Sequence, residues 1–317
     1  MKAYQPEGCL INTAENKRLI ASSAGLHEAM AGGKILEGRV SVCDGEHNMI
    51  IDFPCMKGII PRIEGAIGID DGTTRDIALI SKVNKPVCFK IIAINCDKNG
   101  NETAVLSRRI VQEQCKSEYI DNLTPGDIIP ARVTHLEQFG CFVDVGCGIP
   151  SLIPIDAISV SRISHPSDRF KVGQDIKVII KSLDNGRIWL SHKELLGTWI
   201  ENAAMFKTGE TVSGIVRSVE DYGIFIELTP NLAGLAEPRH DVSVGQQASV
   251  YIKAIIPDKM KVKLIAVDVF DAEYKSDKLQ YFINDKHISH WIYTPENSSK
   301  VIETISVSYT HLTLPTI

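Results

Sequence analysis

Two copies of a short aromatic motif are the residues of this chain whose types and spacing say most about its chemistry. Phe139 and Phe142 flank a glycine, and Tyr222 and Phe225 repeat the arrangement 83 residues later. Aromatic rings on a protein surface can stack on the bases of single-stranded nucleic acid, and each stacked base contributes about 1 to 3 kcal/mol. The chain has only 9 Phe, 8 Tyr and 3 Trp, so the recurrence indicates a shared role. The motif therefore predicts a nucleic-acid-binding surface.

The alternative is that these rings belong to hydrophobic cores. A spacing of three places two side chains on opposite faces of a regular strand. Gly140 and Gly223 would permit a bulge or a strong coil, which can turn both rings to one face. Tyr222 is amphipathic and suits a half-exposed position. We therefore expect both pairs on a surface.

The motif belongs to a longer repeat, which is typical of duplicated domains. At the shift of 83, Gly126 matches Gly209 and Leu152 matches Leu235. Beyond this point the shift becomes 72, and it pairs Lys181 with Lys253. One fold has been copied, and the second copy has a shorter connection.

Each copy is predicted to form five short strands. In the first of the two copies, aliphatic and β-branched segments separated by Gly, Pro, Asp and Asn cover residues 128–133, 142–145, 151–155, 176–180 and 188–190. Asn185-Gly186 is a strong signal for a two-residue hairpin. Five strands in roughly 70 residues suit a small closed barrel, which leaves no exposed strand edge. The sequence predicts a mainly β fold of tandem oligonucleotide-binding (OB) barrels joined by short helices.

The motif strings of residues 126–191 resemble the S1 RNA-binding domain, a family named after the largest protein of the bacterial small ribosomal subunit. The resemblance lies in Gly126-Asp127, residues 139–144, 148–155, 171–174 and 186–191. The whole chain resembles a short, three-repeat relative of the clostridial type. The resemblance implies a five-stranded barrel that contacts single-stranded RNA through an aromatic pair, a histidine ending the third strand and a basic residue entering the fifth.

Carried over residue by residue, this pattern implies an RNA-binding set in two repeats. Pro154 and Glu237 stand at the histidine position of these repeats. A glutamate beside phosphates repels them, so the later repeat is expected to bind less well. The implied RNA-binding residues are Phe139, Phe142, Lys181, Asp184, Arg187, Tyr222, Phe225, Lys253 and Lys261.

A third copy lies upstream at a shift of 93, which takes Gly33 to Gly126 and Val40 to Val133. Its aromatic positions fall on Glu46 and Met49, and its arginine position falls near Thr103. Without a stacking pair, this copy is expected to be a structural or protein-contacting module.

The composition narrows the function classes. The 34 basic and 39 acidic side chains give a net charge of −5, so affinity for RNA must come from stacking and a few local cations. The 8 cysteines include no Cys-x-x-Cys pair, which favours reduced thiols in a cytoplasm. The chain has no apolar stretch long enough to span a membrane. His287 and His290 alone are a weak metal-ligand set.

The repeats divide the chain into predicted segments. Ser107 is expected to cap a helix that ends at Pro125-Gly126, and a second helical stripe runs from Leu195 to Phe206. Asn12 and Glu15 are spaced like a capping box. Residues 307–316 resemble the translated read-through of a sequencing-library adapter. The expected segments are a helical start at 1–28, repeats at 29–115, 126–193 and 206–270, linkers at 116–125 and 194–205, an aromatic tail at 271–305 and an artefact at 306–317.

The function predicted from the sequence is non-catalytic binding of single-stranded RNA, in particular mRNA, together with the small ribosomal subunit in translation. No cofactor and no small-molecule substrate is expected, because the chain has no phosphate-cradling loop, clustered carboxylate set or nucleophile–base pair. A protein-interaction scaffold is the alternative, in which the barrels dock protein partners. The RNA-binding arm of an enzyme is a third class, for which no catalytic domain is found.

Overall fold

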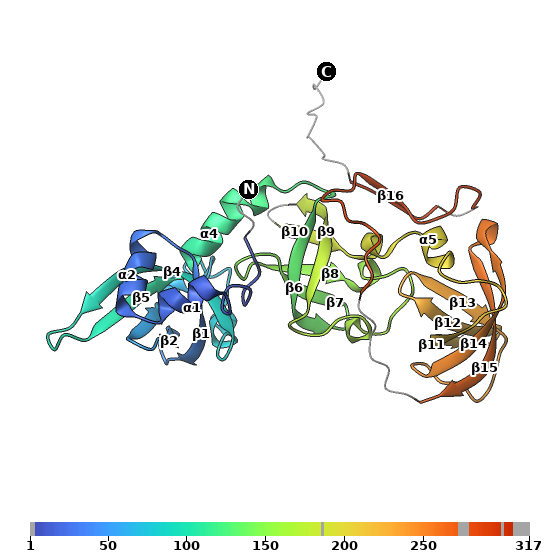
Figure 1. Cartoon of the computed structure of the whole chain (residues 1–317), viewed down its shortest axis with the longest axis horizontal. Helices are drawn as coiled ribbons and strands as arrows, with labels where there is room; N and C mark the ends of the chain where they lie inside the picture. Colours follow the sequence, from blue (N-terminus) through green and yellow to red (C-terminus); the bar gives the residue numbers. More distant parts are fainter. Residues whose placement is uncertain (1–3, 185–186, 272–278, 299–300, 307–317) are drawn as a thin grey trace, which may run out of the picture. The chain divides into compact units, whose positions relative to one another are not determined.

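The computed structural model describes residues 4–184, 187–271, 279–298 and 301–306. It contains three closed five-stranded barrels with the same strand order, joined by short helices (Figure 1). In each barrel the first strand pairs with the second and the fourth, and the fifth lies between the third and the fourth. The mainly β tandem-barrel fold predicted from the repeats is confirmed.

The first barrel consists of β1 (Leu36–Cys43), β2 (Met49–Asp52), β3 (Lys57–Ile60), β4 (Pro86–Cys96) and β5 (Glu102–Ser107). Helices α1 (Ala14–Ile20) and α2 (Ser23–Ala31) pack beside it, and the short α3 (Ile77–Ile80) lies in the β3–β4 connection. Leu19 and Leu26 join the barrel core. The residue that caps α1 is Thr13, whose Oγ1 accepts a hydrogen bond from the Asn16 backbone N–H. The expected capping box at Asn12 is therefore wrong by one residue.

The second and third barrels follow two connecting helical segments. The second comprises β6 (Ile128–Glu137), β7 (Gly140–Asp144), β8 (Pro150–Pro154), β9 (Asp175–Asp184) and β10 (Arg187–Ser191). The third comprises β11 (Thr211–Glu220), β12 (Gly223–Thr229), β13 (Leu232–Ala236), β14 (Gln247–Ile256) and β15 (Lys261–Phe270). Helix α4 (Arg109–Glu118) precedes the second barrel, and the Ser107 Oγ accepts from the Ile110 N–H at 3.0 Å, as a cap does.

The predicted helical stripe from Leu195 to Phe206 is divided into two pieces. A 3₁₀ helix (Lys193–Leu196) is followed by α5 (Trp199–Ala203). Gly197 lies between them at φ +83°, a conformation that glycine adopts without a steric penalty. Thr198 and Glu201 then form a capping box that starts α5. The periodicity indicated buried positions correctly, but the turn interrupts the helix.

The chain forms two compact units. The first contains the chain up to Leu123 together with Pro130–Arg132 and Asp144–Pro150, and the second contains the remainder. The first unit therefore holds the first barrel and its helices, and the second unit holds most of the second barrel and all of the third. Among the described residues, no helix is long and apolar enough to cross a membrane.

Within the second unit, buried charges join the second and third barrels. The guanidinium of Arg169, from the β8–β9 connection, donates to Glu227 on β12. Arg217 on β11 donates from Nε to Glu227 at 2.9 Å and approaches Asp168 at 3.3 Å. Asn231 donates from Nδ2 to the carbonyl oxygens of Lys193 and Gly197, both at 2.8 Å. Because breaking a buried ion pair is costly, these contacts fix the two barrels against each other.

The C-terminal segment, residues 279–298 and 301–306, adds a second connection inside this unit. Its hairpin of β16 (His290–Ile292) and β17 (Glu303–Ile305) places Trp291 and Tyr293 in the core of the third barrel. Tyr281 reaches the second barrel, where its hydroxyl accepts the Lys177 N–H at 3.0 Å and its ring lies 5.5 Å from the Lys177 Nζ. The predicted aromatic tail is thus a packing element.

The two C-terminal histidines belong to separate pairs. His287 contacts Asp127 at 2.8 Å, and His290 contacts Glu303 at 2.9 Å. The structure therefore brings each ring to a carboxylate and does not bring the two rings to one metal position. Within the described ranges there is no cluster of three or more metal-ligating side chains.

His192 makes stability pH-dependent in a predictable direction. Its ring is fully buried, lies 5.0 Å from Phe170 and 5.7 Å from Tyr281, and shares a hydrogen bond of 3.0 Å with the Ile158 carbonyl. Burial lowers the pKa of His192 from 6.5 to about 4. Below pH 6.5 His192 binds a proton in the unfolded chain but not in the folded chain. Its contribution to the free energy of unfolding is therefore present above pH 6.5 and is lost as pH falls toward 4.

We expect this histidine to reduce the free energy of unfolding by about 2 kcal/mol between pH 7 and pH 5. Urea denaturation at both pH values measures the change. His192→Gln should be less stable than the parent at pH 7 and should lose less stability on acidification. An equal loss in both proteins would show that His192 does not carry the effect.

Candidate nucleic-acid interface

Hairpin turns place the aromatic pairs on the outside of the second and third barrels. Phe139 lies in the turn between β6 and β7 and is 58% exposed, and Tyr222 lies in the turn between β11 and β12 and is 68% exposed. Phe142 and Phe225 follow on β7 and β12 and are half-buried. The ring centroids are 6.0 Å apart in the first pair and 6.1 Å in the second. The alternative prediction that Phe139 and Tyr222 lie in hydrophobic cores is therefore wrong.

The glycine between the rings has a different role from the expected bulge. Gly223 pairs directly with Glu220 as the first residue of β12, and no extra residue is inserted beside it. The rings meet because the first one sits in the turn, where strand alternation does not apply. A Cβ atom on Gly140 would lie 2.5 Å from the Ile153 carbonyl oxygen, and one on Gly223 would lie 2.5 Å from that of Ala236. The glycines allow this close approach to the neighbouring strand.

The two rings of each pair meet edge to face, with interplanar angles of 89° and 86°. This is a favourable arrangement for aromatic side chains in contact. Each pair therefore places an exposed ring against a half-buried one.

Strand register extends each aromatic pair into a row of side chains across the barrel. In the third barrel, Phe225 pairs with Leu235, Leu235 with Lys263, and Lys263 with Ala254. In the second barrel, Trp189 pairs with Leu152 and with Ser182. We call these sets the outer rows; they are Leu152, Trp189 and Ser182 in the second barrel, where β8 neighbours the strand of Phe142, and Phe225, Leu235, Lys263 and Ala254 in the third.

Sequence reasoning missed two residues of the second barrel's face. Trp189 is 38% exposed, and strand alternation could have found it, because it stands two residues after Arg187 and so faces the same side. His135 is exposed, and its ring lies 6.5 Å from that of Phe142. No local motif marks His135; the pairing of β6 with β7 brings it there.

The predicted cations lie at matching places of the two barrels. Arg187 and Lys261 are exposed first residues of β10 and β15, and they pair with Asp184 and Ile256. Asp184 is the last residue of β9. The predicted Asn185-Gly186 turn lies outside the described residues.

Lys181 and Lys253 occupy equivalent β-bulges. In the second barrel the pairing passes from Ile180 to Ser182, and Lys181 is left without a partner strand residue. In the third barrel it passes from Ile252 to Ala254, and Lys253 is left out in the same way. A bulge inserts one extra residue and re-aims its side chain. Both lysines are exposed.

The first barrel presents an aliphatic row at this place. Register pairs Val42 with Ile50, Ile50 with Ile59, and Ile59 with Val105. The position of Phe225 therefore corresponds to Ile50, and the expectation of Met49 is wrong, because Met49 is fully buried in the core. Val42 is 52% exposed. This face offers apolar surface without an aromatic ring.

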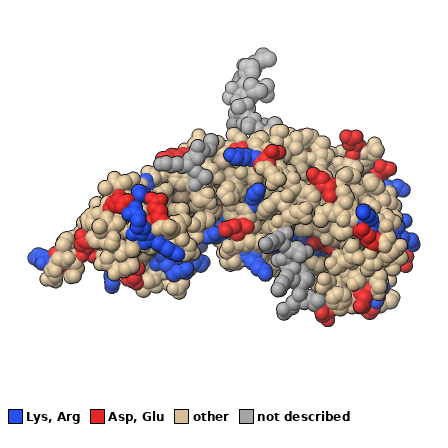
Figure 2. All heavy atoms as spheres, viewed as in Figure 1, with Lys and Arg blue, Asp and Glu red and all other residues tan. Residues whose placement is uncertain are grey.

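The face drawn in Figure 2 carries charged side chains of both signs. Figure 2 shows Lys and Arg side chains scattered among Asp and Glu side chains on the face drawn, in line with the net charge of −5. Pro154 ends β8 and is half-buried, whereas Glu237 follows β13 and is exposed. A net charge of this sign gives no long-range attraction for phosphates.

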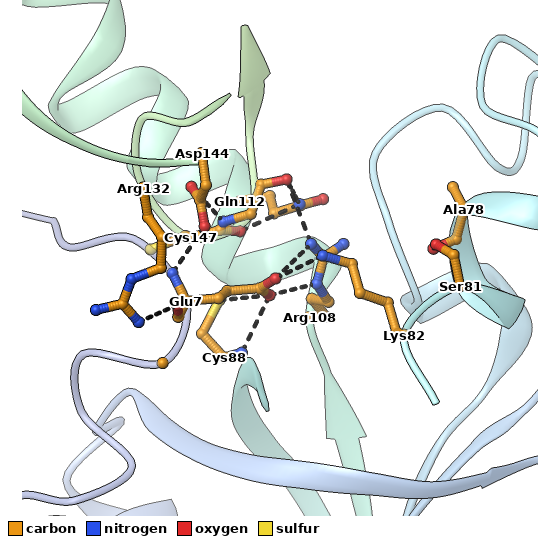
Figure 3. A network of polar contacts seen from close by, with 12 residues as sticks. Glu7, Ala78, Ser81, Lys82, Cys88, Arg108, Gln112, Arg132, Asp144 and Cys147 are labelled. Carbon is orange, nitrogen blue, oxygen red and sulfur yellow. Dashed lines mark hydrogen bonds and ion pairs between the residues drawn. The ribbon is translucent and has the colours of Figure 1, made fainter. Parts of the chain in front are cut away.

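A second polar cluster, in the first unit, is largely buried. The Glu7 carboxylate accepts from Arg108 Nε at 2.6 Å, from Lys82 Nζ at 2.8 Å and from the Cys88 N–H at 3.2 Å (Figure 3). The Glu7 N–H donates to Asp144 at 2.7 Å. Burial would raise the pKa of Glu7, but the charges of Arg108 and Lys82 lower it to about 2. The Glu7 carboxylate is paired with two cations inside this unit, so we assign the cluster to stability.

Comparison with known proteins gives relatives for part of the chain. Residues 122–193 match the family model of the S1 RNA binding domain. The small ribosomal subunit protein bS1 of Staphylococcus aureus strain COL is 32% identical over 182 residues, which cover 52% of this chain and 46% of that protein. The bS1 protein of Rhizobium meliloti strain 1021 is 30% identical over 233 residues, 68% of this chain and 39% of the relative.

The chain thus spans about half the length, or less, of these curated relatives. Among solved structures, a multidomain protein with nucleic acid binding domains from Streptococcus pneumoniae TIGR4 aligns over 77% of both chains at 13% identity, with a TM-score of 0.25.

Proposed function

This chain carries an S1 RNA-binding domain and is homologous to the bacterial small ribosomal subunit protein bS1, and we propose that it binds single-stranded RNA through the outer faces of its second and third barrels. The observation that carries the proposal is the exposed edge-to-face ring pair, which recurs at 6.0 and 6.1 Å on both barrels. The bound RNA is mRNA, and the protein acts in the cytoplasm with the small ribosomal subunit. Its role is binding and not catalysis.

The second barrel is proposed as the principal RNA site. It combines Phe139, Phe142 and Arg187 with the family match over residues 122–193. In the third barrel, Tyr222 and Lys261 stand at the same places, but Glu237 adds an exposed negative charge after β13. A phosphate bound directly beside Glu237 would be repelled at short range.

The preference for single strands is the direct test. Stacking uses base faces, which a duplex hides, and it tolerates every base. We expect clear binding of a fluorescent single-stranded RNA, a mild bias for pyrimidines and much weaker binding of a duplex of equal length. The salt dependence should correspond to about 2 to 4 neutralised phosphates. Equal affinity for both forms in an anisotropy titration would contradict the proposal.

A protein-docking scaffold is the second candidate, favoured by the aliphatic row of the first barrel. Val42, Ile50, Ile59 and Val105 offer no base-stacking ring, and apolar surface of this kind suits a protein partner. The same titration separates the candidates, because a scaffold would show no affinity for single-stranded RNA.

A further inference from the structure

The outer rows of the second and third barrels differ at one position in a way that changes their chemistry. Trp189 on β10 and Lys263 on β15 hold the same place, since each pairs with the matching leucine, Leu152 or Leu235. Trp189 is 38% exposed, and Lys263 is exposed as well. One barrel therefore presents an aromatic ring where the other presents an ammonium group.

Trp189 lies where a base separate from the aromatic pair would bind. β8 stands between β7, which carries Phe142, and β10, which carries Trp189, so these two strands are two strand spacings apart, roughly 10 Å. That separation is too large for one base to stack between the rings. Leu152, the β8 partner of Trp189, is half-buried and adds apolar surface beside it. Arg187 lies two residues before Trp189 on the same side of β10, within reach of the phosphate of a nucleotide stacked there.

The third barrel concentrates cations at the equivalent place. Lys261 and Lys263 alternate outward on β15, and Lys253 stands at the bulge of β14 next to Ala254, the partner of Lys263. In the described part of the chain, none of these three lysines forms an ion pair with an acidic side chain. Three unneutralised ammonium groups on neighbouring strands suit phosphates and not base faces.

We infer that Trp189 is a third base-stacking residue of the second barrel, and that the difference between Trp189 and Lys263 gives the two barrels different ligand preferences. This inference rests on the proposed function. The second barrel holds bases by stacking, and the third holds phosphates by charge. The two faces therefore respond differently to salt. A base on Trp189 is retained as ionic strength rises, whereas a phosphate on Lys263 is released.

Tryptophan fluorescence reports on Trp189 directly. The chain has 3 tryptophans, and Trp199 and Trp291 are buried at 2% and 5% exposure. Titrating the full chain with oligouridine should quench the emission and protect it from acrylamide. Trp189→Phe should abolish the acrylamide protection while keeping most of the affinity, and Trp189→Ala should weaken binding about 5- to 150-fold. Unaltered emission and affinity, with RNA bound, would overturn the inference.

Charge-swap variants test the division of labour. Trp189→Lys should steepen the slope of log affinity against log salt by about 0.7, and Lys263→Trp should flatten it by about 0.7, as expected for one phosphate on a single strand. Val172→Lys adds the same charge at a 65% exposed position outside the outer row and should leave the slope unchanged. Equal slopes for Trp189→Lys and Val172→Lys would contradict the assignment.

Different results would contradict the proposed function and the inference about Trp189 and Lys263. If the unaltered chain binds no single-stranded RNA, the proposed function is wrong and the inference falls with it. If the chain binds RNA and Phe139→Ala weakens binding, but the variants at 189 and 263 behave like Val172→Lys, only the inference is wrong. Thermal unfolding of each variant confirms that it is folded.

Discussion

Replacing Glu7 with glutamine is expected to lower the free energy of unfolding by about 3 to 5 kcal/mol. The Glu7 carboxylate is buried against Arg108, whose side chain is 3% exposed, and against Lys82. Without it, the Arg108 guanidinium keeps a buried charge without its carboxylate partner. Urea denaturation of the full chain measures the loss. A matched control is Glu15→Gln, because Glu15 pairs with Lys34 at 2.8 Å on the surface, where ion pairs contribute little.

A double variant separates charge from packing. Glu7→Leu combined with Arg108→Met replaces the ion pair with apolar side chains, which is often neutral or stabilising. The double variant should therefore be more stable than Glu7→Gln. The pKa of Glu7, about 2 in the folded chain against an ordinary 4.5, means that its contribution is present above pH 4.5 and disappears as pH falls toward 2. A loss for Glu7→Gln no larger than that of Glu15→Gln would refute the assignment.

Removing the aromatic pair of the second barrel is expected to give the largest loss of RNA affinity. Phe139→Ala and Phe142→Ala should each weaken binding of single-stranded RNA by about 1 to 3 kcal/mol. Phe139 is 58% exposed, so its removal should leave stability nearly unchanged. A buried phenylalanine would cost about 3 to 5 kcal/mol of stability on truncation. Anisotropy titration and urea denaturation of the same full-length variants give both quantities.

The matched comparison is the same change in the third barrel. Tyr222→Ala removes a ring in the equivalent turn and should reduce affinity less than Phe139→Ala does, because Glu237 is expected to weaken the proposed site of the third barrel. Val172→Ala, at an exposed apolar position away from the rings, controls for a general loss of surface. A core-sized loss of stability for Phe139→Ala, with RNA affinity retained, would be fatal to the stacking proposal.

The sequence predicted the barrels and the ring pairs because both follow from local patterns. Alternating strands, turn residues and a constant repeat shift are readable along the chain, and they placed Tyr222 and Phe139 in equivalent positions. The same method misplaced Met49, because five residues separate Cys43 from Met49 in the first hairpin, whereas two separate Glu220 from Gly223 in the third barrel. A constant repeat shift assigns the wrong residue when a turn differs in length between two repeats.

Other features depend on contacts between distant residues and left no local signal. Glu7 meets Arg108 across 101 positions, and Tyr281 meets Lys177 across 104. Neither pair has a spacing that a sequence motif could express. The packing of the C-terminal segment and the position of His135 beside Phe142 belong to the same class, because strand pairing and docking decide them.

The buried contacts of Glu227 with Arg169 and Arg217 bear on how the two proposed RNA sites would cooperate. Domains on a loose tether search a volume, and their effective concentration declines smoothly with tether length. Here the second and third barrels are held at a set separation, so the two proposed sites acquire their relative position when the chain folds. Bivalent affinity would then depend on length, because an oligonucleotide gains it only when its contacted bases are separated by the span between the two sites.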